Sequence, residues 1–273
     1  MLIVIVLILV LVLVLMYGFE RKGNERKKLG NESVKNVSII IVYDNNRYRE
    51  GLETAWGFSC VIRCGRTILF DTGGNGNILL ENMEKLGIDP GDIDIIVLSH
   101  IHSDHVGGLL KFLKVNHNVT VYLPKSFPDV FKWEIKKYGA KVVEVQEPLK
   151  IFDGVYSTGE MGVWIKEQSL LIRTGRGIIV ITGCAHPGIV NIVKRAKELL
   201  GNDVLLVVGG FHLIGNSEQS IREIISNLKD LGVKYVAPCH CSGDLARKLF
   251  KEEYKERYVN AGVGKVIVLN NLT

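Results

Sequence analysis

Three segments far apart in the chain each run from an apolar stretch of strand length into a turn that carries histidine. These pairs are 95–98 with His100, 178–182 with His186 and 234–238 with His240. In α/β proteins the carboxyl ends of such strands converge on one rim of a sheet, where the chemistry is kept. The pattern therefore predicts an α/β fold in which the three histidine-bearing turns meet at one site.

The densest of these turns places three imidazoles and a carboxylate within the six residues 100–105. Histidine and aspartate are ligands of a borderline metal such as zinc. His100 and His102 alternate along an extended turn and would grip one ion, whereas Asp104 and His105 face elsewhere and would serve a second. We therefore expect one or two divalent ions; zinc fits these ligands, and manganese or iron would also be accepted.

Residues 38–273 contain no linker-like stretch rich in proline, serine or glycine, so we expect a single catalytic domain there. Strand-like and helix-like segments alternate through most of it. The expected helices are 78–86, 106–114, 127–138, 189–200, 217–231 and 244–255. We expect two sheets packed face to face with helices outside.

Residues 1–19 carry no charged side chain and are nearly all Ile, Leu and Val. At about 1.5 Å per residue this run is just long enough to cross a bilayer as a helix, which favours an uncleaved membrane anchor. A cleaved signal peptide and a misassigned start are the alternatives, and the last would give a soluble cytoplasmic protein.

Residues 20–37 are polar and rich in lysine, and are expected to form a flexible tether between membrane and domain. Because positive residues gather on the cytoplasmic side of an anchor, the catalytic domain is expected in the cytoplasm.

The net charge of +5 at pH 7 is modest, and part of it lies in the tether. Attraction to anionic lipid headgroups accounts for that part. The domain shows no basic stripe interleaved with aromatic residues, so no nucleic-acid partner is expected. A small-molecule substrate, of phosphorylated type, is expected instead.

The five cysteines are unevenly placed. Cys60 and Cys64 lie in or near a strand and are expected to pack as small apolar groups. Cys184, Cys239 and Cys241 flank the candidate ligands His186 and His240, which indicates a soft second layer behind the ligands or a redox-sensitive rim.

The pattern His-x-His-x-Asp-His after an apolar strand resembles the signature of the metallo-β-lactamase superfamily. Its companions stand in the same order, namely 67–74 upstream and 178–188 and 234–243 downstream. The resemblance covers residues 38–273. It implies an αββα four-layer sandwich, in which two packed mixed sheets have helices outside.

The resemblance also implies roles for individual residues. The first metal would be held by His100, His102 and His186, and the second by Asp104, His105 and His240. Asp71 would orient a ligand or a site water from behind.

This chain departs from the superfamily pattern at one position. A bridging carboxylate should end the strand before the last histidine motif, but residues 203–213 have no acidic residue there. His212 either takes that place as a ligand or binds substrate. A site without the carboxylate would hold the second ion more loosely.

The motifs at 70–73, 182–191, 209–213 and 239–243 together resemble the dihydropteroate-synthase-like branch of the superfamily. Archaeal members of that branch join a dihydropterin-methyl diphosphate to an aryl amine and release diphosphate. The resemblance implies the same condensation here, as a step of methanopterin or folate-type pterin synthesis.

Two other functions stay open at the level of sequence. One is hydrolysis of a phosphoester, thioester or related substrate by a metal-bound hydroxide, with Asp104 or His212 managing the proton. The other is a non-catalytic protein that binds metal or senses redox state, as the cysteine-flanked histidines would allow.

Overall fold

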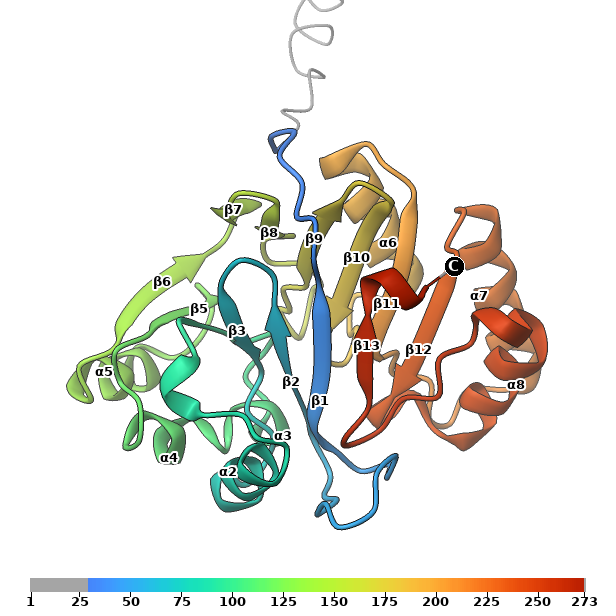
Figure 1. Cartoon of the computed structure of the whole chain (residues 1–273). Coiled ribbons are helices and arrows are strands. Elements are labelled where there is room, and N and C mark those ends of the chain that lie inside the picture. Colours follow the sequence, from blue (N-terminus) through green and yellow to red (C-terminus); the bar gives the residue numbers. More distant parts are fainter. Residues whose placement is uncertain (1–28, 273) are drawn as a thin grey trace, which may run out of the picture.

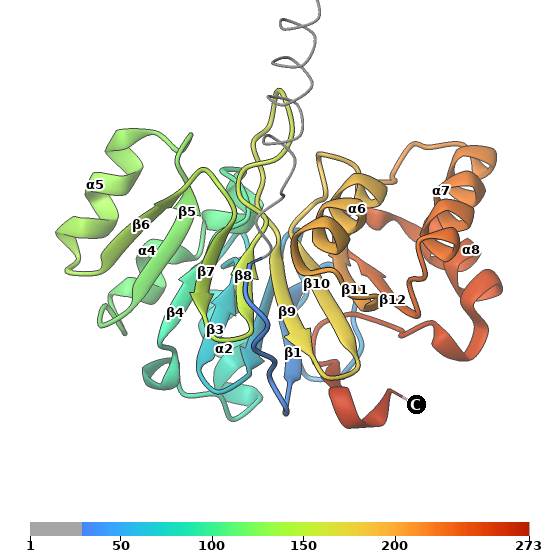
Figure 2. The same ribbon diagram turned by 90° about the horizontal axis from the view of Figure 1, so that it is seen from above.

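The computed structural model describes residues 29–272, in which two β-sheets pack face to face between two layers of helices. Figure 2 shows these layers from above, with α4 and α5 outside one sheet and α6, α7 and α8 outside the other. The αββα architecture expected from the sequence is confirmed.

The first sheet is seven-stranded within the described residues, in the order β13-β1-β2-β3-β4-β5-β6. Strands β3 to β6 run parallel, and β13, β1 and β2 are antiparallel to their neighbours. The strands are β1 Ser38–Asp44, β2 Phe58–Arg63, β3 Thr67–Phe70, β4 Ile95–Val97, β5 Thr120–Pro124, β6 Lys141–Val145 and β13 Val266–Val268.

The second sheet is six-stranded in the same range, in the order β12-β11-β10-β9-β8-β7. Strands β10, β11 and β12 run parallel, and β7, β8 and β9 form an antiparallel extension. The strands are β7 Leu149–Phe152, β8 Val155–Ser157, β9 Leu170–Thr174, β10 Gly177–Thr182, β11 Val204–Gly210 and β12 Tyr235–Cys239.

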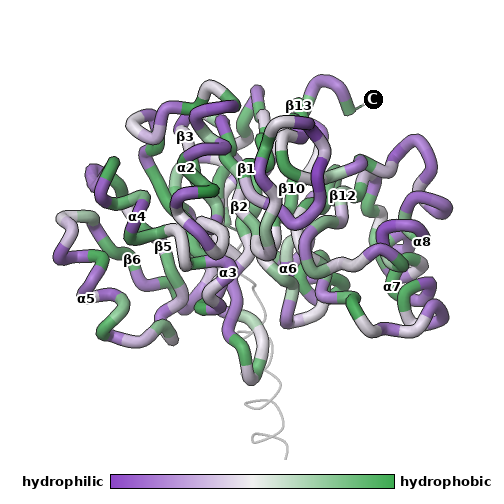
Figure 3. Tube along the Cα trace, turned by 90° about the horizontal axis from the view of Figure 1, so that it is seen from below, coloured by the Kyte–Doolittle hydropathy of each residue, from purple (hydrophilic) through white to green (hydrophobic). Residues whose placement is uncertain are grey.

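The helices are amphipathic and bury their apolar stripes on the outer faces of the sheets (Figure 1). One group packs on the first sheet and the other on the second, and an apolar layer fills the space between the sheets. Figure 3 shows the apolar residues gathered along the strands. The helices are α2 Gly76–Lys85, α3 Ser103–Val106, α4 Leu109–Leu113, α5 Asp129–Lys137, α6 Ile189–Leu200, α7 Glu218–Asp230 and α8 Asp244–Tyr254.

The single helix expected at 106–114 is wrong, because the chain forms two short helices there. Gly107 and Gly108 separate them, and both press against the turn that follows β3. A Cβ atom on Gly108 would lie 2.1 Å from the carbonyl oxygen of Thr72, and one on Gly107 would lie 2.4 Å from that of Gly74. This close backbone approach fixes the position of the turn that follows β3.

The described part of the segment expected to be a tether contacts the domain. The amide of Leu29 donates to the carbonyl of Leu199 at 3.2 Å, and that of Val34 donates to the carbonyl of Arg173 at 2.8 Å. Leu29 thus contacts the end of α6, and Val34 contacts β9 of the second sheet. The earlier part of the tether and the expected anchor, residues 1–19, fall outside the described residues.

Within residues 29–272, no helix combines the length and the apolar character needed to cross a bilayer.

Candidate metal centre

The carboxyl ends of five strands meet at one edge of the sandwich and bring all the expected ligands together (Figure 1). Strands β3 and β4 come from the first sheet, and β10, β11 and β12 from the second. Asp71 follows β3, and residues 100–105 follow β4. Cys184 and His186 follow β10, His212 follows β11 and His240 follows β12. The centre therefore lies where the two sheets face each other.

His100, His102 and His186 form the first group of rings. Their centroids lie 4.6 Å apart for His100 and His102, 4.8 Å for His100 and His186 and 4.9 Å for His102 and His186. The Nε2 atoms of His100 and His186 are buried and have no hydrogen-bond partner. Two buried ring nitrogens are thus left without a partner, as expected where a cation binds.

Asp104, His105 and His240 form the second group. Nε2 of His105 lies 3.2 Å from Nε2 of His240. The Oδ2 atom of Asp104 lies 3.6 Å from the first of these nitrogens and 3.3 Å from the second. Three donor atoms therefore converge at spacings that one metal ion could fill.

Asp71 orients a histidine of each group. Its Oδ2 accepts from Nδ1 of His105 at 2.7 Å and from the Ser99 hydroxyl, also at 2.7 Å. Because that hydroxyl donates to Asp71, it accepts from Nδ1 of His100, 2.9 Å away. Both Nδ1 atoms then carry the proton, and both Nε2 atoms offer their lone pairs to the centre.

Two residues that the sequence analysis did not single out, Asn45 and Asp44, hold His240 in place. Oδ1 of Asn45 accepts from Nδ1 of His240 at 3.0 Å, and Oδ2 of Asp44 accepts from its backbone amide at 3.2 Å. Cys239 donates its thiol to Asp44. The ring of Trp56 lies 4.8 Å from that of His240.

Glu167 was also missed, because it stands in a short polar segment without a motif. The residue is buried. Its two carboxylate oxygens accept from the backbone amides of Cys184, Ala185 and His186 at 3.0, 2.9 and 2.8 Å. One side chain therefore fixes the turn that carries the third histidine of the first group.

The backbone at this edge is held in an uncommon conformation. Among the described residues, five non-glycine residues have a positive φ, and four of them lie at the centre: Asp71, Ala185, His212 and His240, with φ from 48° to 61°. Strain of this kind persists where the surroundings over-determine it, and it gathers at functional sites.

Cys184 and Cys241 lie inside the centre, whereas Cys239 lies behind it. Sγ of Cys184 is 3.2 Å from Nε2 of His105. The donor atoms of Cys184, Cys241 and His212 all lie within 4.8 Å of one another.

His212 is exposed beside His186, and the centroids of the two rings lie 4.3 Å apart. Its donor atoms do not join those of His105 and His240.

The protonation of the first group suits metal binding, whereas in the second group burial opposes the charge of His105 but the carboxylate of Asp71 raises its pKa overall. Burial lowers the pKa of His100 well below its usual value, and burial with the neighbouring imidazoles lowers the pKa of His186 to about 4. Burial opposes ionisation of Asp104, but the hydrogen bond with His240 and the nearby charge of His105 lower its pKa overall. Neutral histidines and an ionised aspartate are the forms that bind a divalent ion.

These donors fit one or two divalent ions. Nitrogen atoms dominate, one carboxylate and two thiols accompany them, and the ring nitrogens left unpartnered are buried. Such a set is typical of zinc.

A cavity of about 390 Å³ adjoins the centre on the side of His240. Its apolar walls include Trp56, Ile214 and Leu245, whose side chains are all exposed. Its polar lining includes Asp244 and Asn216. The cavity thus combines exposed apolar side chains with polar groups beside His240.

The sequence is similar to those of known proteins. The chain is 33% identical over 250 residues to 7,8-dihydropterin-6-methyl-4-(beta-D-ribofuranosyl)-aminobenzene-5'-phosphate synthase of Methanocaldococcus jannaschii, covering 74% of this chain and 84% of that protein. An uncharacterized protein of the same organism is 31% identical over 261 residues, covering 84% of this chain and 99% of its own.

Among solved structures, Tm1679, a metal-dependent hydrolase of the β-lactamase superfamily, matches with a TM-score of 0.71 and 30% identity. The match covers 85% of this chain and 98% of that one. The model of the metallo-β-lactamase superfamily matches residues 57–240, which hold all the candidate histidine and aspartate ligands. The chain belongs to the metallo-β-lactamase superfamily.

Proposed function

We propose that the protein is a metal-dependent transferase that joins a dihydropterin-methyl diphosphate to an aryl amine. The amine nitrogen attacks the methylene carbon, the carbon–oxygen bond to diphosphate breaks, and the amine loses a proton. The observation that carries this proposal is the 33% identity to a synthase of this kind over 84% of that protein's length.

The cavity beside His240 supports the proposal, because it suits a pterin ring. Trp56 offers an exposed indole face for stacking. Asp244 is exposed at the cavity, and its carboxylate could pair with adjacent N–H groups on the edge of an aminopyrimidine ring. The methylene carbon would then reach toward the ligands at His240.

The residues of the centre would serve two further steps of the reaction, the departure of diphosphate and the removal of the amine proton. A divalent ion held there would neutralise the diphosphate as it leaves. His212 is exposed at the rim, so its imidazole can accept the proton that the aryl amine loses.

The proposal is tested with purified full-length protein, zinc and a dihydropterin-methyl diphosphate, with and without ribofuranosylaminobenzene phosphate. We expect diphosphate to be released together with the condensed pterin, and only when the amine is present. A His212→Ala variant should lose roughly 100-fold or more in turnover while keeping its metal. Exposed His117 gives the matched control, since His117→Ala should change neither.

Hydrolysis is the second candidate, and the similarity to Tm1679 favours it. The same assay separates the two functions. Release of diphosphate without amine, together with formation of the hydroxymethyl pterin, would replace condensation by hydrolysis. Absence of any product from the pterin substrate would contradict the pterin proposal altogether.

A further inference from the structure

We propose that Cys184 is a direct metal ligand whose sulfur bridges the two ions. This inference concerns the centre alone and does not depend on which reaction the protein performs.

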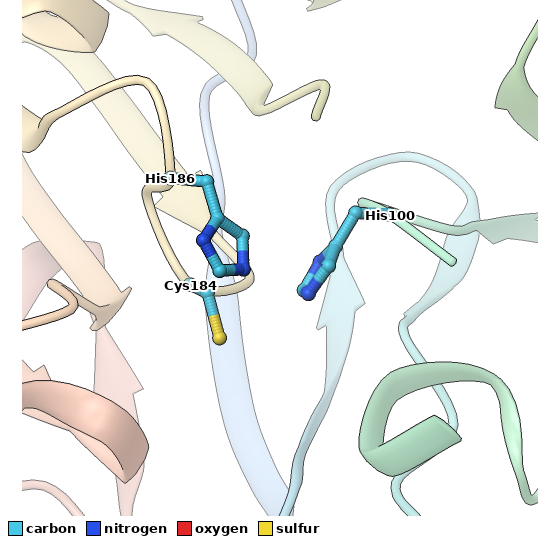
Figure 4. A group of neighbouring side chains, drawn as sticks. All are labelled: His100, Cys184 and His186. Carbon is cyan, nitrogen blue, oxygen red and sulfur yellow. The ribbon is translucent and has the colours of Figure 1, made fainter. Parts of the chain in front are cut away.

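Cys184 is the one residue shared by both sets of histidine donors. Its Sγ lies within 4.8 Å of the ring nitrogens of His100 and His186, and within 4.8 Å of those of His105 and His240. Figure 4 shows the first of these groups, in which the His100 side chain comes from the turn after β4 and those of Cys184 and His186 come from the turn after β10.

The spacing is that of ligands on a shared ion. With metal–sulfur and metal–nitrogen bonds of about 2.3 and 2.0–2.1 Å, a tetrahedral ion separates its sulfur and nitrogen ligands by roughly 3.6 Å. Sγ of Cys184 lies 3.2 Å from Nε2 of His105. A sulfur bound to two ions would hold them about 3.5–4 Å apart, the usual spacing in two-metal sites.

The unpartnered nitrogens support a ligand at this point. His100 is fully buried, its Nε2 has no hydrogen-bond partner, and it lies in the same donor group as the sulfur. A buried nitrogen left unpaired costs free energy, and a cation between it and the sulfur would remove that cost.

Asp104 approaches His105 and His240, but among the described residues neither it nor another carboxylate joins a donor group that includes the sulfur. The end of β11, where an acidic side chain could reach in, is occupied by Gly210. A Cβ atom there would lie 2.6 Å from Sγ of Cys241 and 3.3 Å from Cα of Cys184. The backbone of Gly183 and the two cysteines therefore fill the space that a side chain from this position would need.

The other candidates for a bridge are placed less well. His212 and Cys241 form a donor group with Cys184 but join neither pair of histidines. Cys184, in contrast, is held by the hydrogen bond from its backbone amide to Glu167, at 3.0 Å. Its position between the two sets is thus set by the fold.

The test uses full-length protein loaded with Co²⁺, in which a thiolate ligand gives a sulfur-to-cobalt charge-transfer absorption in the near ultraviolet. We expect this absorption in the unmodified protein and its loss in Cys184→Ala and Cys184→Ser. Cys241→Ala and the matched control Cys60→Ala should retain it, since Cys60 is buried in the layer between the sheets. Circular dichroism checks that each variant is folded.

Cobalt titration separates a bridging from a terminal sulfur. Because replacing even an outer partner of a ligand costs about 10–100-fold in affinity, loss of a bridge should weaken both ions by roughly 100-fold or more. Charge-transfer absorption that persists in Cys184→Ser, or that disappears in Cys241→Ala instead, would overturn the proposal. Weakening of one ion with the other unchanged would show a terminal ligand and overturn the bridge.

Discussion

The carboxylate of Glu167 accepts a hydrogen bond from the backbone amide of His186 at 2.8 Å, across 19 positions of sequence. The same carboxylate accepts from the two preceding amides. The position of His186 thus depends on a buried side chain from the segment before β9, and this dependence can be measured.

Replacing Glu167 by alanine should loosen the turn that carries His186. Three buried amides would lose their acceptor, at about 1–3 kcal/mol each, so we expect a loss of roughly 3 kcal/mol or more in unfolding free energy. Metal affinity should fall about 10–100-fold. Denaturant unfolding and metal titration measure the two effects.

Glu167→Gln keeps one acceptor oxygen and should lose less than Glu167→Ala. The matched control is Glu223→Ala, since Glu223 is exposed on α7. If Glu167→Ala bound metal as tightly as the control, Glu167 would have no part in placing His186.

Local sequence patterns correctly predicted helices and strands that are determined by residues close together in the chain. The helix expected at 189–200 is found as α6 with the same bounds. Its apolar residues recur at helical spacing, and it ends at Gly201 in the left-handed conformation that glycine favours. The strand ends that carry histidine were readable for the same reason, since each follows a continuous apolar run.

Long-range contacts decided what the sequence could not show. The helix expected at 106–114 is divided because Gly107 and Gly108 pack against a turn more than 30 residues earlier. Glu167 and Asn45 contact the ligand turns across 19 and 195 positions of sequence. No pattern near either residue signals that contact.

The cavity beside His240 predicts a specific effect of Trp56. Loss of a stacked aromatic contact is worth about 1 kcal/mol, so Trp56→Ala should raise the KM for the dihydropterin substrate by roughly fivefold to tenfold. Metal content should not change. Steady-state kinetics and elemental analysis measure the two quantities.

Trp133 provides the control, because it is exposed on α5 within the first helix layer. Trp133→Ala should leave the KM unchanged. A Trp56→Ala variant with the same KM as this control would show that the Trp56 indole does not bind the pterin ring.

The buried histidines predict how the metal-free protein responds to acid. Burial lowers the pKa of His186 from 6.5 to about 4 and that of His100 well below 6.5. Between about pH 4 and pH 6.5 the unfolded chain therefore binds more protons than the folded one, and these histidines make stability fall as the pH falls. Their contribution is fully present above pH 6.5.

Melting temperatures of chelator-treated protein near pH 7 and pH 5 check this expectation. The loss on acidification should be smaller in His186→Gln, because glutamine does not titrate. An equal loss in the two proteins would show that His186 has the same pKa in the folded and unfolded chain.

The most direct test of a two-ion centre is elemental analysis of the full-length protein after zinc loading and removal of free metal. We predict two zinc ions per chain, fewer in His102→Ala, which loses a first-group histidine, and two again in His117→Ala. A protein that retains only one zinc ion per chain would contradict the two-ion centre, and a His102→Ala variant with the full complement would contradict the assignment of this histidine as a metal ligand.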